Sequence, residues 1–190
     1  MTPPTSPPTP KPTQPAANWS ALKAKLMGLD PAGLLGLLQA LYAASKDNQA
    51  FLHTRFGLGD DVLKPYKASL DRWLCPDVFR NQDVSVSKAK KAIAAFKKAG
   101  GTTQGLAELM VYFSERAAWF SANVGMDNEV YLTALVNMFN EALNLVTALP
   151  AGQGDALLGR LQAVRTVCQN LGYGVGEDIE DLWARQGLPD

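Results

Sequence analysis

The chain has 190 residues, 47% hydrophobic and 19% charged, with 18 Lys/Arg against 18 Asp/Glu and so no formal net charge. This composition is that of a globular protein, and the length supports one well-buried core. No apolar run reaches the roughly 18 residues that a membrane helix needs, and the N-terminus lacks the apolar segment of a signal peptide. We therefore expect a cytoplasmic protein without membrane contact, in which Cys75 and Cys168 are reduced thiols.

The zero net charge hides two oppositely charged halves. Residues 1–100 carry 14 Lys/Arg and 7 Asp/Glu, whereas residues 101–190 carry 4 Lys/Arg and 11 Asp/Glu. The simplest interpretation is that the basic and acidic halves attract each other within one chain. Head-to-tail self-association and contact with two different protein partners are the alternatives.

The N-terminal segment has a composition typical of disorder. Residues 1–17 contain seven prolines and four threonines, which favours an extended, polyproline-II-biased tail. Pro7-Pro8-Thr9-Pro10 could dock in an aromatic groove, but a passive tail is the favoured interpretation. We expect the folded domain to occupy residues 18–190.

The first half of this domain shows repeated helical patterns. A first helix begins near Trp19, and Asp30 is predicted to cap a second helix that has Pro31 at its first position. The face of the second helix that we expect to be buried carries Leu34, Leu37, Leu38 and Leu41. Two further helices are predicted over residues 47–56 and from Asp60 or Asp61 to Leu74, followed by a loop over residues 77–84.

A lysine-rich helix follows, capped by Ser85 or Ser87 and ending near Ala99. Its apolar face carries Ala89, Ala92, Ile93 and Phe96, and its opposite face carries Lys88, Lys90, Lys91, Lys97 and Lys98. Five ammonium groups on one face could bind phosphates of a nucleic acid. However, the one aromatic residue of this helix, Phe96, points inward and offers no stacking surface beside the lysines. We therefore favour a solvated face, or docking with the acidic half, over nucleic-acid binding.

Two long helices over residues 105–149, broken at Gly125-Met126-Asp127, are predicted to form the centre of the fold. The first has apolar residues at three- and four-residue steps, and a second strip made by Tyr112 and Trp119 on roughly the opposite side. A helix that is apolar on two sides must be covered on two sides. Further helices are expected over residues 155–170 and from Glu177. The predicted fold is all-α, either a single-domain bundle or a short stack of antiparallel helical hairpins, with eight or nine helices.

The sequence contains few signals of catalysis or metal binding. Glu108, Glu115 and Glu141 lie on the central helices, but di-iron bundles need Glu-x-x-His motifs and His53 is the one histidine. We assign no metal, no cofactor and no catalytic residue, and a Cys75–His53 pair has no support beyond its residue types. The glycine run at 172–176 precedes a helix that begins with four carboxylates, which would repel a phosphate. A possible pocket remains, formed by Glu108, Tyr112, Glu115 and Trp119.

Several of these helix patterns resemble a bacterial family, domain of unknown function 6155. The resemblance covers about residues 20–185 and is carried by Leu22-x-x-x-Leu26-x-x-Leu29-Asp30, Leu34 to Leu41-Tyr42, Phe51-Leu52, Arg55-Phe56, Lys88-Ala89-Lys90-Lys91-Ala92-Ile93-x-x-Phe96 and Leu109-Met110-x-Tyr112. It implies an all-helical bacterial protein and no particular activity.

Three functional hypotheses follow from the sequence. The first is a non-enzymatic module that contacts another protein, or a second copy of itself. The second is a nucleic-acid-associated protein that uses the five lysines, and the third is a small-ligand binder or an enzyme with a site near Tyr112, Glu115 and Trp119.

Overall fold

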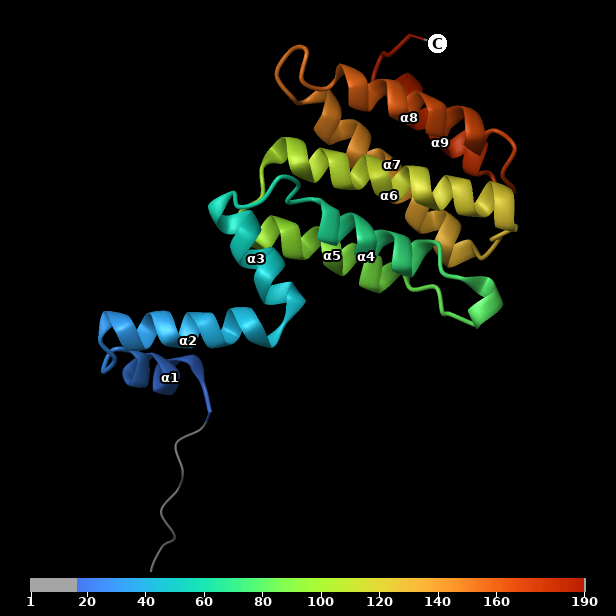
Figure 1. Ribbon diagram of the computed structural model, residues 1–190. Helices are drawn as coiled ribbons and strands as arrows, with labels where there is room; N and C mark the ends of the chain where they lie inside the picture. Colours follow the sequence, from blue (N-terminus) through green and yellow to red (C-terminus); the bar gives the residue numbers. More distant parts are fainter. Residues whose placement is uncertain (1–16, 190) are drawn as a thin grey trace, which may run out of the picture. The chain divides into compact units, whose positions relative to one another are not determined.

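The computed structural model describes residues 17–189, apart from the side chain of Val78. The proline-rich stretch, including Pro7-Pro8-Thr9-Pro10, lies almost entirely outside the described residues, so the predicted tail stays a prediction. Within residues 17–189 the chain forms nine α-helices and one short 3-10 helix, with no strand (Figure 1). The prediction of an all-α fold is confirmed.

The helices begin where the sequence places capping residues. In chain order they are α1 Trp19–Leu26, α2 Pro31–Ala44, α3 Lys46–Phe56, α4 Lys64–Leu74, the 3-10 helix η1 Val78–Arg80, α5 Val86–Lys98, α6 Thr103–Val124, α7 Glu129–Thr147, α8 Asp155–Cys168 and α9 Val175–Arg185. Asp30 accepts a hydrogen bond from the backbone N–H of Gly33, and Ser85 accepts one from that of Lys88. Each cap satisfies a donor that the first helical turn leaves unpaired.

The chain separates into two compact units, with the boundary between Lys46 and Asp47. The sequence led us to expect one domain from residue 18 onward. We describe each unit separately. The described part of the first, residues 17–46, is called the N-terminal unit, and that of the second, residues 47–189, is called the bundle.

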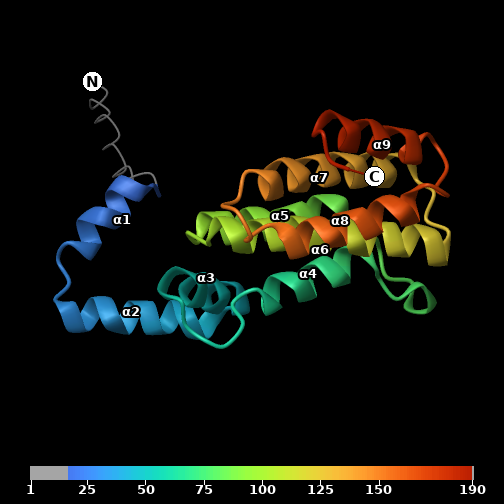
Figure 2. The same ribbon diagram turned by 90° about the horizontal axis from the view of Figure 1, so that it is seen from above.

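Six helices of the bundle form a stack of three antiparallel hairpins, α4–α5, α6–α7 and α8–α9 (Figures 1 and 2). Helix α6 lies at its centre and packs against α4, α5, α7 and α8. The predicted break between α6 and α7 is also present, because Gly125 ends α6 in the left-handed conformation with φ of 78°. The prediction that two long helices form the centre is therefore confirmed.

The core of the bundle is formed mainly by aromatic and branched side chains of α6 and α7. Leu109, Phe113, Leu135 and Phe139 are fully buried, and such side chains each stabilise the fold by about 1.5–3 kcal/mol through burial. The buried Tyr131 hydroxyl donates a 2.9 Å hydrogen bond to the backbone oxygen of Leu74, which ties α7 to the end of α4. The hairpins are thus joined by shared apolar contacts and by specific polar ones.

The N-terminal unit lacks a core of this kind. None of its residues 17–46 is buried, and α1 and α2 make few contacts with each other. The predicted buried face of α2 is wrong, since Leu34, Leu37, Leu38 and Leu41 are 38–48% exposed. The helical periodicity correctly indicated that these four leucines lie on one face of α2. Within this unit, however, only the short helix α1 is present to pack against that face.

Two predicted helix boundaries also differ from the structure. Helix α4 begins at Lys64 instead of Asp60 or Asp61, because Asp61 accepts a hydrogen bond from the backbone N–H of Leu63 within a turn. The last helix begins at Val175, two residues before the predicted Glu177, directly after Gly174 in the left-handed conformation.

Candidate functional site

Helices α4, α6 and α8 bring together a cluster of four ionic side chains. Arg160 of α8 donates hydrogen bonds from Nε and Nη2 to the two carboxylate oxygens of Glu115, at 2.7 and 2.6 Å. Its Nη1 donates to Glu108 at 2.5 Å, and Lys67 of α4 donates to the other oxygen of Glu108 at 2.7 Å. A planar guanidinium held by two carboxylates is rigid, so the position of Arg160 is fixed.

The protonation of this cluster follows from its contacts. Burial raises the pKa of Glu108, but the hydrogen bonds from Arg160 and Lys67 outweigh burial, and the net result is a lowered pKa. The hydrogen bonds to Glu115 are the main cause of a raised pKa of Arg160. Burial opposes this rise, and the hydrogen bond to Glu108 adds to it. Two cations therefore balance two carboxylates in this cluster.

A second ionic group lies next to this cluster, between α4 and α6. The Tyr112 hydroxyl donates a 2.8 Å hydrogen bond to Asp71, and Arg116 Nε lies 2.7 Å from the other carboxylate oxygen of Asp71. The Arg116–Asp71 contact is an ion pair without the directed geometry of a hydrogen bond. Burial and the bond to Asp71 raise the pKa of Tyr112 to about 12, so its hydroxyl stays protonated.

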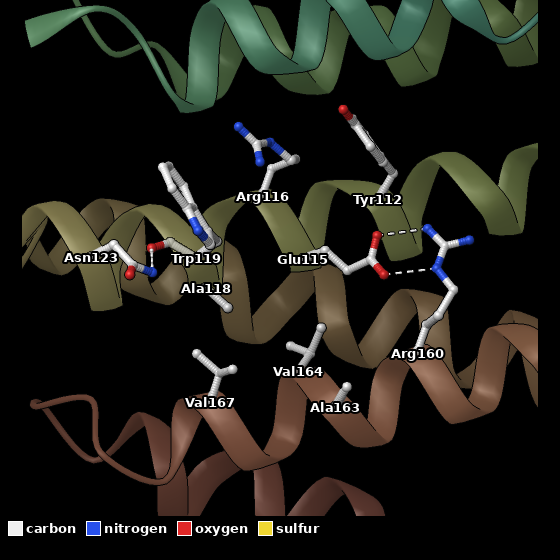
Figure 3. Close-up of a pocket in the computed structure, with 10 residues that line it drawn as sticks. All are labelled: Tyr112, Glu115, Arg116, Ala118, Trp119, Asn123, Arg160, Ala163, Val164 and Val167. Atoms are coloured by element: carbon white, nitrogen blue, oxygen red, sulfur yellow. Dashed lines mark hydrogen bonds and ion pairs between the residues drawn. The ribbon is translucent and has the colours of Figure 1, made fainter.

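A cavity of about 370 Å³ opens between α6 and α8 beside these groups. In Figure 3, Ala163, Val164 and Val167 of α8 face Ala118 and Trp119 of α6, with the Glu115–Arg160 pair at one end and Asn123 at the other. Three of the four residues predicted to form a pocket line this cavity, namely Tyr112, Glu115 and Trp119. The fourth, Glu108, lines a neighbouring cavity of about 410 Å³ that also borders on Arg160.

The lysine-rich helix has the predicted division into two faces. Ala89, Ala92, Ile93 and Phe96 are buried in the bundle. Lys88, Lys91, Lys97 and Lys98 are exposed and Lys90 is half-buried.

The expectation of no aromatic surface beside the lysines is wrong, because α4 supplies one. The Trp73 ring lies 3.9 Å from Lys88 Nζ and 4.4 Å from the Arg72 guanidinium. Both distances are in the range of a cation–π contact. Nucleic-acid binding by the lysines stays a prediction.

Cys75 and Glu141 are the remaining candidate residues whose surroundings the structure describes. Burial raises the pKa of the Cys75 thiol to about 11, and its Sγ donates to the backbone oxygen of Arg116. A nucleophilic cysteine needs a lowered pKa, so this thiol is not activated. Glu141 is exposed on α7. Among residues 17–189, His, Cys, Asp and Glu side chains do not gather in a group of three that could hold a metal ion.

Sequence reasoning missed two features of this molecule. Arg160, which holds Glu108 and Glu115, precedes the core residue Leu161, and the seven-residue spacing of the two carboxylates could have prompted a search for such a cation. The second is the exposed apolar surface of the N-terminal unit. The helical spacing of the leucines in α2 had led us to expect this surface to be buried.

Comparison with protein families, with curated proteins and with solved structures finds no match to this chain. The resemblance to domain of unknown function 6155 therefore stays a prediction. Within the described part, no helix combines the length and the apolar character that crossing a lipid bilayer requires.

Proposed function

We propose that this protein is a non-enzymatic interaction module, in which the N-terminal unit binds an apolar helix of a partner protein. The observation that carries the proposal is the exposure of this unit. Ten large apolar side chains are exposed there, namely Trp19, Leu22, Met27, Leu29, Leu34, Leu35, Leu37, Leu38, Leu41 and Tyr42. Large exposed apolar surfaces on globular domains commonly mark sites of contact with another molecule.

The energetics of short helices support the same conclusion. Helix α2 has 14 residues, and isolated helices of about 12–15 residues are marginal in water. Most of the stability of such a helix comes from burying its apolar face against a neighbour. Ten side chains at these exposures offer on the order of 1,000 Å² of apolar surface, compared with roughly 800 Å² per partner in a typical stable complex. A partner would supply the burial that α1 does not.

The composition of α2 indicates what kind of partner fits. Residues 31–44 include five leucines and a tyrosine but no charged side chain. Recognition must therefore rest on packing of apolar side chains instead of on ion pairs. An amphipathic helix that presents its own leucine or aromatic stripe has this chemistry, and two such elements pack as a helical bundle.

Replacing leucines on the apolar face of α2 with glutamate, a charged residue of high helix propensity, tests the proposal. We expect the Leu34→Glu, Leu38→Glu double variant to lose the partner while keeping its helices, because Glu has a high helix propensity. A photo-crosslinking amino acid at position 35, used in cells of the native host, would covalently trap whatever protein covers α2. Light scattering of the purified chain over a range of concentrations distinguishes a second copy from a different protein.

Two matched controls make the outcome specific. Gln39→Glu adds charge to α2 without removing a leucine, and Val130→Glu changes an exposed apolar residue of α7. Both should retain the crosslink. A chain that stays monomeric and gives no protein crosslink from position 35, or one that crosslinks only to lipid, would overturn the proposal.

A further inference from the structure

We propose that the cavity between α6 and α8 binds a neutral aromatic small molecule. The cavity belongs entirely to the bundle, so this proposal does not rest on the function proposed above. Its volume of about 370 Å³ is enough for a ligand of one or two rings, since small-molecule sites typically occupy about 300–1,000 Å³.

The cavity exists because small residues lie where α6 and α8 face each other. Ala118 of α6 and Ala163 of α8 leave room that larger side chains would fill (Figure 3). The surrounding wall is held in place, since α8 packs on α6 and Arg160 is fixed by its hydrogen bonds to Glu115 and Glu108. The cavity therefore has a defined shape before any ligand arrives.

Trp119 gives the cavity a preference for flat apolar groups. Its side chain is 46% exposed, although it lies on the central helix of the bundle. The Arg116 guanidinium lies 4.9 Å from the ring centroid, and Val164 and Val167 extend the apolar wall on α8. An aromatic ligand can pack edge-on or offset against the indole while its other side meets the valines.

The charges around the cavity select against charged ligands. Each of its two cations is already neutralised, Arg116 by Asp71 and Arg160 by Glu115 and Glu108. A charged ligand would lose water without gaining an unpaired counter-charge. Asn123 donates its side-chain N–H to the backbone oxygen of Trp119 at 2.8 Å. Its amide oxygen is thus placed to accept a hydrogen bond from a single ligand N–H or O–H.

Three probes with the same ring and different charge test this assignment. Indole is neutral, indole-3-acetate is an anion and tryptamine is a cation. The chain has four tryptophans, so a ¹H–¹⁵N spectrum shows four indole N–H signals, and Trp119→Phe identifies that of Trp119. We expect indole to shift the Trp119 signal in a saturable way, and each charged probe to bind at least about threefold more weakly.

Filling the cavity provides the decisive variant. Ala163 is exposed, so the larger side chain of Ala163→Leu occupies part of the cavity without entering the core. We expect this variant to weaken indole binding roughly tenfold or more. Ala184→Leu, at an exposed position of α9, is the matched control and should bind like the parent. Either variant is used only if its spectrum shows the folded bundle.

Each other outcome overturns the proposal. If indole shifts the signal of Trp19 instead of Trp119, the ring binds the N-terminal unit and the cavity is not the site. Unchanged affinity in Ala163→Leu would exclude the cavity in the same way. Equal or tighter binding of a charged probe would overturn the assignment to neutral ligands.

Discussion

The bundle and the N-terminal unit are built from the same kind of residues but differ in what those residues contact. Leu109 in α6 is fully buried, whereas Leu35 in α2 is 67% exposed. Helix α6 packs against four other helices, while α2 has only α1 beside it within its unit, with few contacts. Leucines at helical spacing therefore predict a helix and its apolar face, but not whether the chain itself supplies the helix that covers it.

The two regions differ equally in how they use charge. In the bundle, Arg160, Glu108 and Lys67 join three helices through hydrogen bonds of 2.5–2.7 Å. Helix α2 has no charged side chain at all. Ionic contacts thus add directional links between helices in the bundle, whereas the N-terminal unit offers only apolar surface.

The largest expected difference is between the same substitution made in the two regions. We expect Leu109→Ala to lower the free energy of unfolding of the bundle by about 2–5 kcal/mol, because it leaves a cavity in the core. Leu35→Ala should change it by less than about 0.5 kcal/mol, as is usual for exposed positions. Urea denaturation followed by circular dichroism measures both values.

The comparison would fail if the two leucines behaved alike. A loss of several kcal/mol in Leu35→Ala would mean that α2 is covered in the purified chain. Repeating the measurement over a range of protein concentrations then reveals whether a second copy provides the cover.

Glycine-to-alanine substitutions should have opposite signs in the two regions. A Cβ at position 101 would overlap the buried Phe96 ring, so we expect Gly101→Ala to destabilise the bundle by about 1–3 kcal/mol. At Gly36 of α2 a Cβ meets no atom within 4 Å. Gly36→Ala should therefore stabilise α2 by about 1 kcal/mol through helix propensity alone.

Hydrogen exchange measures the two glycine effects separately. Slower amide exchange across residues 31–44 in Gly36→Ala, with unchanged exchange in α6, is the expected result. Slower exchange in both regions would instead indicate that the two units unfold as one.

Much of the fold could be predicted from the sequence because it depends on local signals. Asp30 and Ser85 marked helix starts, Gly125 marked the break between α6 and α7, and the stripe containing Phe113 identified the central helix. These features act over a few residues, and the structure retains them. The exposure of Leu38 could not be predicted in this way, because the same stripe occurs whether or not a neighbouring helix is present.

The candidate site was predictable only in part, for a similar reason. Tyr112, Glu115 and Trp119 share a strip of one helix, so their spacing placed them together. Arg160 comes 45 residues after Glu115, and no local pattern links the two. The cavity itself depends on which small residue of α8 faces Ala118, which is a property of helix packing and not of either helix by itself.

The last expected effect depends on pH and concerns the ionic cluster of the bundle. Because the folded-state pKa of Glu108 is lowered, its contribution to stability is fully present above the ordinary glutamate pKa of about 4.3. The contribution is lost as the pH falls from there through the lower, folded-state value. We expect Glu108→Gln to cost about 1–2 kcal/mol at pH 7, since it removes charged hydrogen bonds from Lys67 and Arg160.

Measuring urea unfolding at pH 7 and again near pH 3 separates this charge effect from a change in packing. Near pH 3 Glu108 is protonated in the unfolded chain, whereas its pKa in the folded protein is lowered. Part of its contribution to stability is therefore lost there, and the difference between parent and Glu108→Gln should shrink. Glu141→Gln, at an exposed carboxylate of α7, is the matched control and should leave stability nearly unchanged at both values. A Glu108→Gln deficit that stayed the same at both pH values would show that the side chain acts through its shape. In that case the hydrogen-bonded cluster would position α8 without stabilising the bundle through its charge. The difference in charge between the bundle and α2 would then not correspond to a difference in stability.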